Sequence, residues 1–353
     1  MKRWRVCVLA ALSILIMGGC KTTTENEVKQ DARFPETIYM EADRVTVDCK
    51  LEIDDGSRNQ QKQLPGVDGE IYPDAERAYQ TYVDGKEVKE EYHDEGSDGW
   101  PDRDSYIFLD GGTMTVGPTF AFGTANSKYY SRVGTTKEEN VNEYAEHPVS
   151  FMSGEEAVDQ VKKALKDLGY PEEEFYFSYY SLNWETMKNV ESRYADKGLI
   201  EADNIKDEWS EEDDAYLVYA FQKASDLPVY HRMMSMTHEL AFDTVDSAPV
   251  QAIYSTRGFE WMYISNIYDF EGENEVQLQN IDNIIHVVTD KYNALLNDST
   301  YLVNRAKLYV RVYLDENQDY KTSLIWYFEV QDDSGKKEVM LVDAVSGKEI
   351  YLP

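Results

Sequence analysis

Two stretches of the sequence have the spacing of amphipathic helices, and strand-like runs follow each of them. The first helix is expected to begin at the capping box Ser153-Gly154-Glu155-Glu156, in which the serine and glutamate side chains satisfy free backbone amides. Its apolar stripe comprises Ala157, Val158, Val161, Ala164, Leu165 and Leu168, and Gly169 and Pro171 mark its end. The second stripe comprises Ile281, Ile284, Ile285, Val288, Tyr292 and Leu295. Because each stripe needs a sheet to be buried against, the sequence predicts an α+β fold.

The strand-like runs divide the chain into three folding units. The region 36–148 is predicted to be rich in β-structure, and the regions 149–270 and 271–353 are each predicted to combine a helix with an antiparallel sheet. The expected strands of the first region are 37–53, a hairpin at 79–92 around Asp84-Gly85, 105–109, 113–116, 119–122 and 129–133. Those of the second are 174–184, 215–222, 228–239 and 249–264, with a short helix at 186–197, and those of the third are 306–314, 324–330, 338–342 and 349–352.

The first twenty residues have the organisation of a secretory signal. Lys2, Arg3 and Arg5 precede the apolar run 6–17, which is interrupted only by Ser13, and small residues follow it. The run is too short for a transmembrane helix, which needs about 20 apolar residues. The polar segment 21–35 lacks apolar periodicity and is predicted to be a flexible tether.

The segment Ile16-Met17-Gly18-Gly19-Cys20 resembles the lipobox of bacterial lipoproteins. Small residues stand at the two positions before the cysteine, as in that family, although Met17 occupies the place where leucine is commonest. The resemblance implies that residues 1–20 are a lipoprotein signal peptide ending at the lipidated Cys20, whose thiol receives a diacylglyceryl group. Two acyl chains give stable attachment, since each buried methylene contributes about 0.8 kcal/mol. The expected location is therefore the extracytoplasmic face of the bacterial cell membrane.

The chain is strongly acidic, with a formal net charge of −32. Removal of the signal takes away three basic residues and makes the remaining chain more acidic still. Such a charge repels nucleic acid and anionic lipid headgroups, so we expect no nucleic-acid partner and membrane contact only through the lipid anchor. A hydrophobic content of 42% is nevertheless sufficient for a folded core.

Cysteine usage indicates a domain that is stabilised by its core alone. Of three cysteines, Cys7 belongs to the signal and Cys20 to the anchor, so Cys49 has no partner for an intramolecular disulfide in the mature chain. A disulfide-free extracytoplasmic domain favours a Gram-positive source. Because Cys49 lies in an alternating run, we expect a small core side chain rather than a reactive thiol.

The C-terminal unit resembles PepSY-type domains in its last strands, 326–330, 339–344 and 346–350. In those domains a strand ends in Asp-Ala before a Thr-Gly-like turn, and here Asp343-Ala344 precedes Ser346-Gly347. The whole mature chain is similar to an uncharacterised family of Firmicutes lipoproteins of unknown function. It also loosely resembles extracytoplasmic sensor-kinase regulators of the YycH/YycI type, which are held by a transmembrane helix rather than by a lipid. None of these resemblances implies catalytic residues.

His231 and His238 are candidate metal ligands. His238-Glu239 begins like the HExxH motif of zinc proteases, but Phe242 occupies the position of the second histidine. His231 and His238 also flank Met233, Met234 and Met236, a ligand set suited to copper. We expect this run to be a strand, on which residues seven apart point to opposite faces. The sequence therefore predicts no metal site, no cofactor and no catalytic residue.

Two acidic stretches offer calcium as an alternative. Asp94, Asp98, Asp102 and Asp104 lie in one loop, for which a solvated acidic loop is the simpler interpretation; calcium binding by 94–104 is left open. The run 315–319 imitates the start of an EF-hand loop, but Tyr320 replaces the required glycine and Trp326 the closing glutamate. We expect that run to be a hairpin turn.

Aromatic residues are the remaining signal of function, with 27 tyrosines in the chain. One group along the sequence comprises Tyr176, Tyr179, Tyr180 and Trp184, and another comprises Phe259, Trp261, Tyr263 and Tyr268. These side chains suit strand faces, but they are also favoured at binding surfaces.

Three functions follow from these patterns. We expect a lipid-anchored protein with a non-enzymatic binding or regulatory role at the cell surface, whose protein, peptide or glycan partner the sequence does not identify. The alternative is a substrate-binding lipoprotein that recognises a glycan or peptide through aromatic side chains, and an enzyme assembled from distant segments is the third. An aromatic cleft would favour a binding protein, clustered histidine and carboxylate groups an enzyme, and a flat apolar patch without a pocket a regulator.

Overall fold

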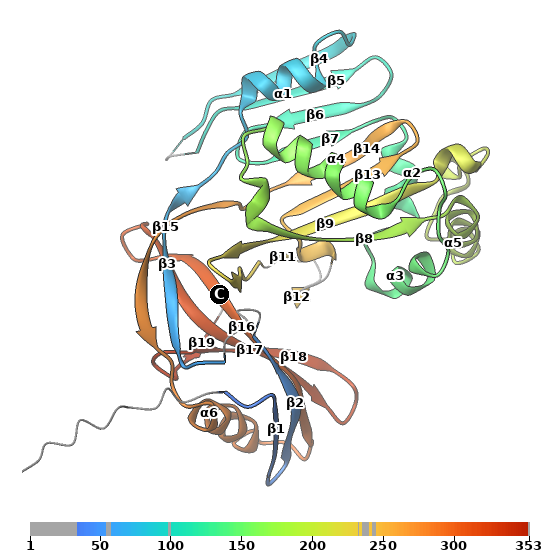
Figure 1. Ribbon diagram of the computed structural model, residues 1–353. Helices are drawn as coiled ribbons and strands as arrows, with labels where there is room; N and C mark the ends of the chain where they lie inside the picture. The colour runs from blue at the N-terminus through green and yellow to red at the C-terminus, as the bar shows by residue number, and fades with distance from the viewer. Residues whose placement is uncertain are drawn as a thin grey trace, which may run out of the picture.

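The computed structural model describes residues 34–53, 58–97, 100–231, 233–234, 240–241 and 245–351. These residues form two lobes, each built on a β-sheet: several helices pack against the larger sheet, and α6 packs against the smaller one (Figure 1). The predicted α+β fold is therefore confirmed, with strands outweighing helices.

The larger lobe contains a nine-stranded sheet in which the described pairings are all antiparallel. Its path runs β10-β9-β13-β14-β7-β6-β5-β4, and β8 also pairs with β9. The bounds are Val88–Asp94 for β4, Arg103–Phe108 for β5, Thr113–Val116 for β6, Phe120–Gly123 for β7, Phe175–Leu182 for β8, Ala215–Ala224 for β9, Leu227–Pro228 for β10, Val250–Ser255 for β13 and Gly258–Ile264 for β14.

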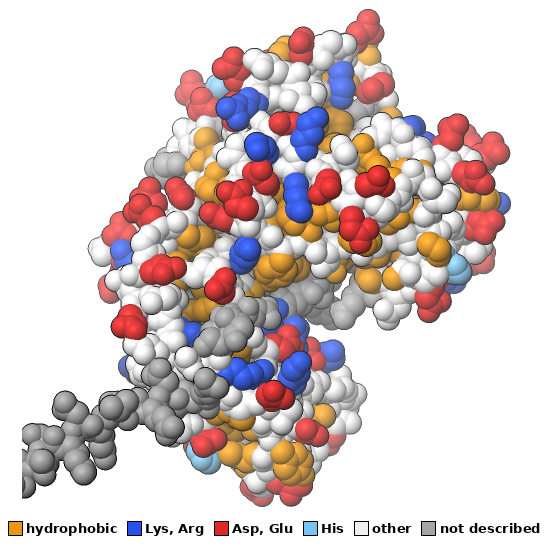
Figure 2. All heavy atoms as spheres, in the orientation of Figure 1, with side chains coloured by type: hydrophobic (Ala, Val, Ile, Leu, Met, Phe, Trp, Pro, Cys, Tyr) orange, Lys and Arg blue, Asp and Glu red, His pale blue; other side chains and the backbone are white. Residues whose placement is uncertain are grey.

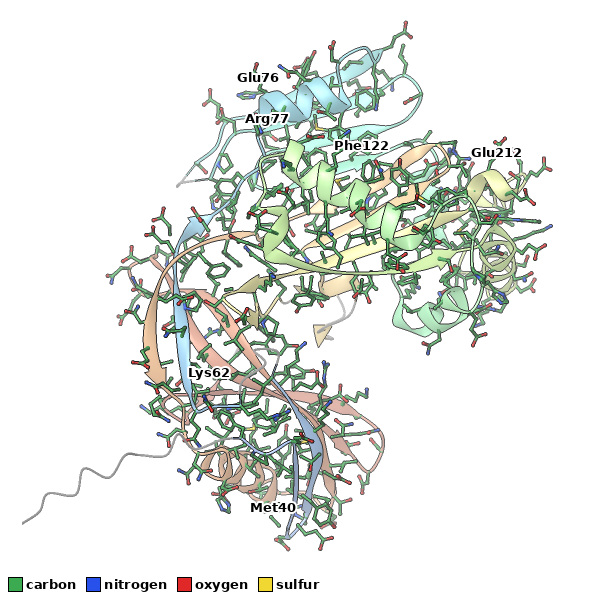
Figure 3. All side chains as sticks on the ribbon, in the orientation of Figure 1. Met40, Lys62, Glu76, Arg77, Phe122 and Glu212 are labelled. Carbon is green, nitrogen blue, oxygen red and sulfur yellow. The ribbon has the colours of Figure 1, made fainter. Side chains whose placement is uncertain are left out.

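Helices lie on both faces of this sheet. One face is covered by α1 (Ala75–Tyr82) and α4 (Gly154–Asp167), as Figure 1 shows. The capping box at Ser153 is present, and the six residues of the predicted α4 stripe are all buried. Phe122, labelled in Figure 3, packs against Tyr82 of α1 with ring centroids 5.0 Å apart. The other face is covered near β8 and β9 by α2 (Ser127–Arg132), α3 (Glu138–Ala145) and α5 (Trp184–Asp196).

The smaller lobe contains a six-stranded sheet in the order β1-β2-β16-β17-β18-β19. The pairing of β16 with β2 is parallel and the others are antiparallel. The bounds are Thr37–Ala42 for β1, Val45–Glu52 for β2, Tyr301–Leu314 for β16, Tyr320–Asp332 for β17, Lys337–Asp343 for β18 and Glu349–Ile350 for β19. The predicted core role of Cys49 is confirmed: the side chain is buried in β2, and burial raises the pKa of its thiol to about 11.

A two-stranded ribbon, β3 (Gln61–Glu70) with β15 (Tyr268–Gln277), runs between the lobes (Figure 1). Lys62 on this ribbon, labelled in Figure 3, is buried, and burial lowers the pKa of its ammonium to about 8. The lobes are also joined by the buried side chain of Gln222. Its Nε2 donates to the carbonyl oxygen of Tyr268 at 2.6 Å, and its Oε1 accepts from the backbone N–H of Tyr268 at 3.0 Å. The backbone N–H of Tyr230 donates to Val310 of β16 at 2.8 Å. The remaining short elements are η1 (Glu172–Glu174), η2 (Ala202–Asn204), η3 (Glu211–Asp213), η4 (Val245–Ser247), β11 (Met233–Met234) and β12 (Leu240–Ala241).

The predicted strand at 129–133 and the predicted hairpin at 79–92 are both wrong. Residues 129–132 belong to α2, because Tyr130 and Val133 are spaced for burial on one side of a helical turn. Residues 75–82 form α1, which begins where the side chain of Asp74 accepts from the N–H of Arg77. Only the second half of the predicted hairpin is a strand, β4.

The two large sheets do not follow the three units expected from the sequence. Strands β1 and β2, from the expected N-terminal region, enter the smaller sheet beside β16, whereas β4 to β7 enter the larger sheet. The region 36–148 and the unit 149–270 therefore share one sheet through the β7–β14 pairing. Local periodicity contains no signal for the β2–β16 pairing, because its partners are far apart in the sequence.

Helix α6 (Ile281–Asn293) packs on the smaller sheet, and five of the six residues predicted for its stripe are buried. Leu295 is the exception, since it lies beyond the helix end and 37% of it is exposed. The run 315–319 is the predicted hairpin turn between β16 and β17, in which the side chain of Asp315 accepts from the N–H groups of Asn317 and Asp319.

Truncation of Ile285 tests the packing of α6. Ile285 is fully buried, so Ile285→Ala should leave a cavity and lower the free energy of unfolding by about 2–5 kcal/mol. His286 is exposed on the same helix, and His286→Ala is the matched control with a much smaller expected loss. Chemical denaturation of both variants makes the comparison. Equal losses, or a larger loss for the His286 variant, would contradict this packing.

Candidate functional site

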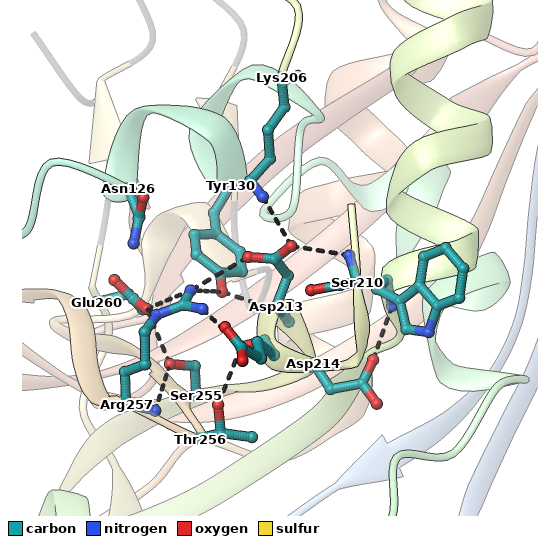
Figure 4. A network of polar contacts seen from close by, with 12 residues as sticks. Asn126, Tyr130, Lys206, Ser210, Asp213, Asp214, Ser255, Thr256, Arg257 and Glu260 are labelled. Atoms are coloured by element: carbon teal, nitrogen blue, oxygen red, sulfur yellow. Dashed lines mark hydrogen bonds and ion pairs between the residues drawn. The ribbon is translucent and has the colours of Figure 1, made fainter. Parts of the chain in front are cut away.

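Two parts of the larger lobe bring distant side chains together. The first is a network of charged and hydroxyl groups at the turn between β13 and β14, shown in Figure 4. We call it the Asp213 network, and it comprises Thr124, Tyr130, Lys206, Ser210, Asp213, Ser255, Arg257 and Glu260. The second is a pocket lined by aromatic and hydroxyl side chains on the same lobe.

Arg257 joins the two buried carboxylates of the Asp213 network. Its Nε lies 2.7 Å from Oε1 of Glu260, and its Nη2 lies 3.2 Å from Oδ1 of Asp213. Oδ2 of Asp213 accepts from Nζ of Lys206 at 2.7 Å and from the N–H of Ser210 at 3.0 Å (Figure 4). Both carboxylates are therefore paired with cations, as buried charges must be.

Hydroxyl groups complete the network. Oε1 of Glu260 accepts from Ser255 at 2.9 Å, and its other oxygen accepts from Thr124. The hydroxyl of Tyr130 donates to the carbonyl oxygen of Asp213 at 3.1 Å, and burial raises the pKa of this phenol. Each carboxylate oxygen of Asp213 and Glu260 thus has a protein partner, which fits a structural junction between a loop, a turn and α2.

The second site, which we call the aromatic pocket, has a volume of about 590 Å³. It is lined by Ser127, Lys128, Ser131, Thr135, Thr136, Gln251, Ile253, Trp261 and Tyr263. Four segments supply these residues: strands β13 and β14, helix α2, and the loop that follows α2. A pocket with an apolar, aromatic wall and a few convergent polar groups is typical of small-molecule sites.

The pleat of the sheet places the aromatic rings of this pocket. Trp261 and Tyr263 are two residues apart on β14 and therefore point to the same face. Their rings are nearly parallel, with an interplanar angle of 6° and centroids 6.4 Å apart. On β13, Ile253 lies opposite Trp261 and Gln251 lies opposite Tyr263. Four side chains from two paired strands thus form one wall.

Helix α2 forms the second wall and reaches the sheet because of a glycine. Gly123 on β7 lies directly opposite Trp261, and a Cβ atom at this position would be 2.9 Å from the hydroxyl oxygen of Ser127. The missing side chain lets Ser127 and Ser131 approach the aromatic rings. Thr135 and Thr136 continue this hydroxyl-bearing wall, and Lys128 supplies one cation.

A larger hollow of about 790 Å³ lies beside the Asp213 network and has a different lining. Its acidic side chains are Glu185, Glu211, Glu212 and Asp214. The carboxylate of Asp214 already accepts from the N–H of Trp184 at 2.8 Å, and burial raises the pKa of this group. Phe151 and Trp184 also line this hollow, but Phe151 packs on Tyr216 at 5.8 Å and the lining is rich in carboxylates. The aromatic pocket, whose two rings are nearly parallel, is therefore the better candidate for binding an uncharged ligand.

The structure divides the two aromatic groups of the sequence, and a register shift in the β13–β14 pairing separates Phe259 from Trp261 and Tyr263. Trp261 and Tyr263 enter the aromatic pocket, whereas Phe259 packs on Tyr254 at 5.0 Å and Tyr268 lies on the ribbon, stacked with His231 at 6.2 Å. In the other group, Tyr180 is buried under the helices, Tyr176 stacks on Phe221, the hydroxyl of Tyr179 donates to Glu155 at 2.7 Å, and Trp184 begins α5. The hydroxyl side chains of the pocket were missed because 129–133 was interpreted as a strand.

The described acidic side chains that the sequence offers as calcium ligands each contact a different protein group. Asp94 pairs with Arg103, Asp102 accepts from the N–H of Gly96 at 2.9 Å, and Asp104 lies 2.7 Å from Nδ1 of His93. Asp98 and His238 lie outside the described residues, as does Cys20. Within the described ranges, no three His, Cys, Asp or Glu side chains are grouped closely enough to hold a metal ion.

Among the helices that the structure describes, none combines the length and apolar composition needed to cross a membrane.

Comparison with known proteins extends the fold observation. No protein-family model matches the chain, and no curated protein matches it. A solved structure of an uncharacterised protein from Eubacterium rectale is similar, with a TM-score of 0.61 and 15% sequence identity. The match covers 90% of this chain and 94% of that chain, so both lobes have a counterpart in it. At this identity the likeness concerns the fold alone.

Removal of the central carboxylate tests the structural role of the Asp213 network. Asp213→Ala should leave Lys206 and Arg257 partly buried without their shared partner, and we expect a loss of about 3 kcal/mol in the free energy of unfolding. Glu211 is exposed in the same short helix, so Glu211→Ala should change stability by less than about 0.5 kcal/mol. Urea denaturation followed by circular dichroism compares the two. A loss for Asp213→Ala no larger than the control's would remove the network's structural role.

Proposed function

We propose that this protein is a non-enzymatic binding protein of the extracytoplasmic membrane surface, and that the aromatic pocket recognises an uncharged glycan. The observation that carries the proposal is the pair of nearly parallel rings, Trp261 and Tyr263, facing a wall of serine and threonine side chains. Among the three functions that the sequence allows, an aromatic cleft favours a binding protein.

The chemistry of the pocket suits a sugar ring. A pyranose has faces made of C–H groups, which pack against an aromatic ring, and a rim of hydroxyl groups that both donate and accept hydrogen bonds. Ser127, Ser131, Thr135 and Thr136 carry hydroxyls with the same dual capacity, and Gln251 adds an amide. Aromatic surface supplies the apolar contact, and the polar groups fix the orientation of the ligand.

Charge supports an uncharged ligand rather than an acidic one. The chain carries a formal net charge of −32, and on the face shown in Figure 2 acidic side chains are spread over both lobes. Such a field repels polyanionic glycans and raises the cost of bringing them to the pocket. Lys128 is a single cation in the pocket lining and does not offset that field.

A regulatory role is the second candidate. In the smaller lobe, α6 precedes β16, β17 and β18, and the turn after β18 is formed by Asp343, whose side chain accepts from the N–H groups of Val345 and Ser346 at 3.2 and 2.6 Å. This order supports the resemblance to PepSY-type domains and to extracytoplasmic regulators. In this second proposal, ligand binding in the larger lobe changes how the smaller lobe contacts a membrane partner.

Removal of the aromatic wall tests the binding role. Trp261→Ala and Tyr263→Ala should each weaken glycan binding at least tenfold, because truncating an aromatic anchor typically costs about 2 kcal/mol or more. A glycan array identifies the ligand, and isothermal titration calorimetry measures the affinities.

Tyr39→Ala is the control, since Tyr39 is an exposed tyrosine on β1 of the other lobe. Its affinity should equal that of the unaltered protein. Retention of full affinity by both pocket variants would eliminate the aromatic pocket as the binding site.

The proposed membrane attachment has its own test. Cys20→Ala removes the thiol that would accept the diacylglyceryl group, so the variant should lose lipid labelling and leave the membrane fraction. Metabolic palmitate labelling with membrane fractionation measures both effects, and Cys49→Ala is the control because Cys49 is buried in β2. Unchanged labelling of the Cys20 variant would show that the lipoprotein interpretation is mistaken.

A further inference from the structure

The face of the large sheet that carries the aromatic pocket is only partly covered. Helices α2, α3 and α5 pack over β8, β9 and β13, where Tyr180, Leu217 and Ile253 are buried beneath them. Beyond the pocket, the same face of β7, β6, β5 and β4 has no helix over it within the described residues. We call this surface the open face.

One row of directly paired residues crosses the open face from the pocket to the sheet edge. It consists of Gln251, Tyr263, Ala121, Thr115, Ser105 and Tyr92, on β13, β14, β7, β6, β5 and β4 in turn. Residues that lie opposite one another in adjacent strands share a face of the sheet. The row is therefore a continuous track with a tyrosine of the pocket at one end and Tyr92 at the other.

Side chains between these two tyrosines are short and suited to contact with a polar ligand. Ala121, Thr115 and Ser105 are half-buried, and the Thr115 and Ser105 hydroxyl oxygens lie 3.1 Å apart. A neighbouring row starts at Trp261, continues through the small residues Gly123 and Thr113, and ends with Ile107 and Glu90. Short side chains between aromatic rings give the track a surface that bears hydroxyl groups, whereas a surface made for another sheet or helix would be apolar.

Strand spacing sets the length of this track. Four inter-strand steps of about 4.8 Å separate Tyr263 from Tyr92, so the track is about 19 Å long. Tyr92 is 51% exposed, and its ring lies at the edge strand where a ligand could end. The aromatic pocket alone would hold one end of a ligand of that length.

We propose that the aromatic pocket and the open face together bind an extended, uncharged oligosaccharide, with its far end on Tyr92. This proposal rests on the proposed function and specifies its ligand as a chain rather than a single sugar. Ala121, Thr115 and Ser105 carry no charge, and Glu90, whose carboxylate accepts from the hydroxyl of Tyr92 at the far end, repels an acidic glycan.

A peptide fits this track less well than a glycan does. The track runs across the strands, and the backbone N–H and C=O groups of β5, β6 and β7 are engaged in pairing on both sides. A bound peptide could therefore add no strand hydrogen bonds along the track, which are the main source of affinity when extended peptides bind sheets. A polyhydroxylated chain instead finds hydroxyl partners at successive strands.

Chain-length dependence of affinity tests the proposal. We would titrate the full-length protein in detergent with α-1,4-linked and β-1,4-linked glucose oligosaccharides, from disaccharide to hexasaccharide, by calorimetry. In one of the two series, affinity should rise about tenfold from the disaccharide to the longest chain, equivalent to about 1.4 kcal/mol. Tyr92→Ala should remove this gain while leaving disaccharide affinity unchanged.

A second variant protects the test against a folding defect. Thr115→Trp places a large side chain in the middle of the track and should also abolish the rise in affinity with chain length. Tyr39→Ala should preserve that rise. Two results would overturn binding along the track but leave the pocket proposal standing. One is equal affinity for disaccharide and hexasaccharide, and the other is an undiminished rise in affinity with chain length in both the Tyr92 and Thr115 variants. Absence of binding by both series, with binding by an acidic glycan or a peptide instead, would overturn the two proposals together.

Discussion

A sheet of nine strands has two faces, and the helices that the structure describes cover one of them more completely than the other. On the α1 and α4 side, alternating side chains such as Met114, Phe122 and Met262 form a continuous apolar core. On the opposite side, the helices stop at α2. Residues beyond that point must be compatible with water, and Ala121, Thr115 and Ser105 are. The candidate site arises at this boundary, where aromatic residues of the covered part meet hydroxyl residues of the open face.

The two lobes depend on a few contacts between segments that are distant in the sequence. Strand β2 pairs with the first half of β16, up to Lys307, and Tyr230 bonds to Val310 further along the same strand. One strand of the smaller sheet is thus bonded to the N-terminal segment and to the segment that leaves the larger sheet. Gln222 adds a second junction, because its buried amide satisfies both backbone groups of Tyr268. Domain boundaries drawn along the sequence could not capture this arrangement.

The sequence predicted what local periodicity can encode. The α4 stripe and its capping box at Ser153, the α6 stripe up to Tyr292, and the turn at 315–319 are all present. Short elements were harder, since the five residues 129–133 fit a strand as well as a helical turn and tertiary packing decides between them.

The same limit applies to the candidate site. Trp261 and Tyr263 could be paired from their spacing on one strand, but Ser127 and Thr135 meet them only through the packing of α2 against Gly123. Tyr92 joins the track through four strand pairings. Turn residues at Asp110-Gly111 and Gly117-Pro118 indicate the β5–β6 and β6–β7 hairpins, but the β7–β14 pairing joins segments far apart in the sequence and has no local signature. Residue pairs on one element and short hairpins were therefore predictable, and contacts between distant elements were not.

The Asp213 network joins the elements that form the aromatic pocket. Glu260 directly precedes Trp261 on β14, and its partner Thr124 directly follows Gly123 on β7, which pairs with Trp261. Tyr130 belongs to α2, the helix that supplies Ser127 and Ser131, and its hydroxyl is bonded to Asp213. The network thus holds β14, the end of β7 and α2 in fixed relation, although it forms no part of the pocket wall. A site whose supporting residues are held in this way loses less conformational entropy when a ligand binds. Because the buried carboxylates of Asp213 and Glu260 are paired with Lys206 and Arg257, this support leaves neither carboxylate unpaired behind the pocket.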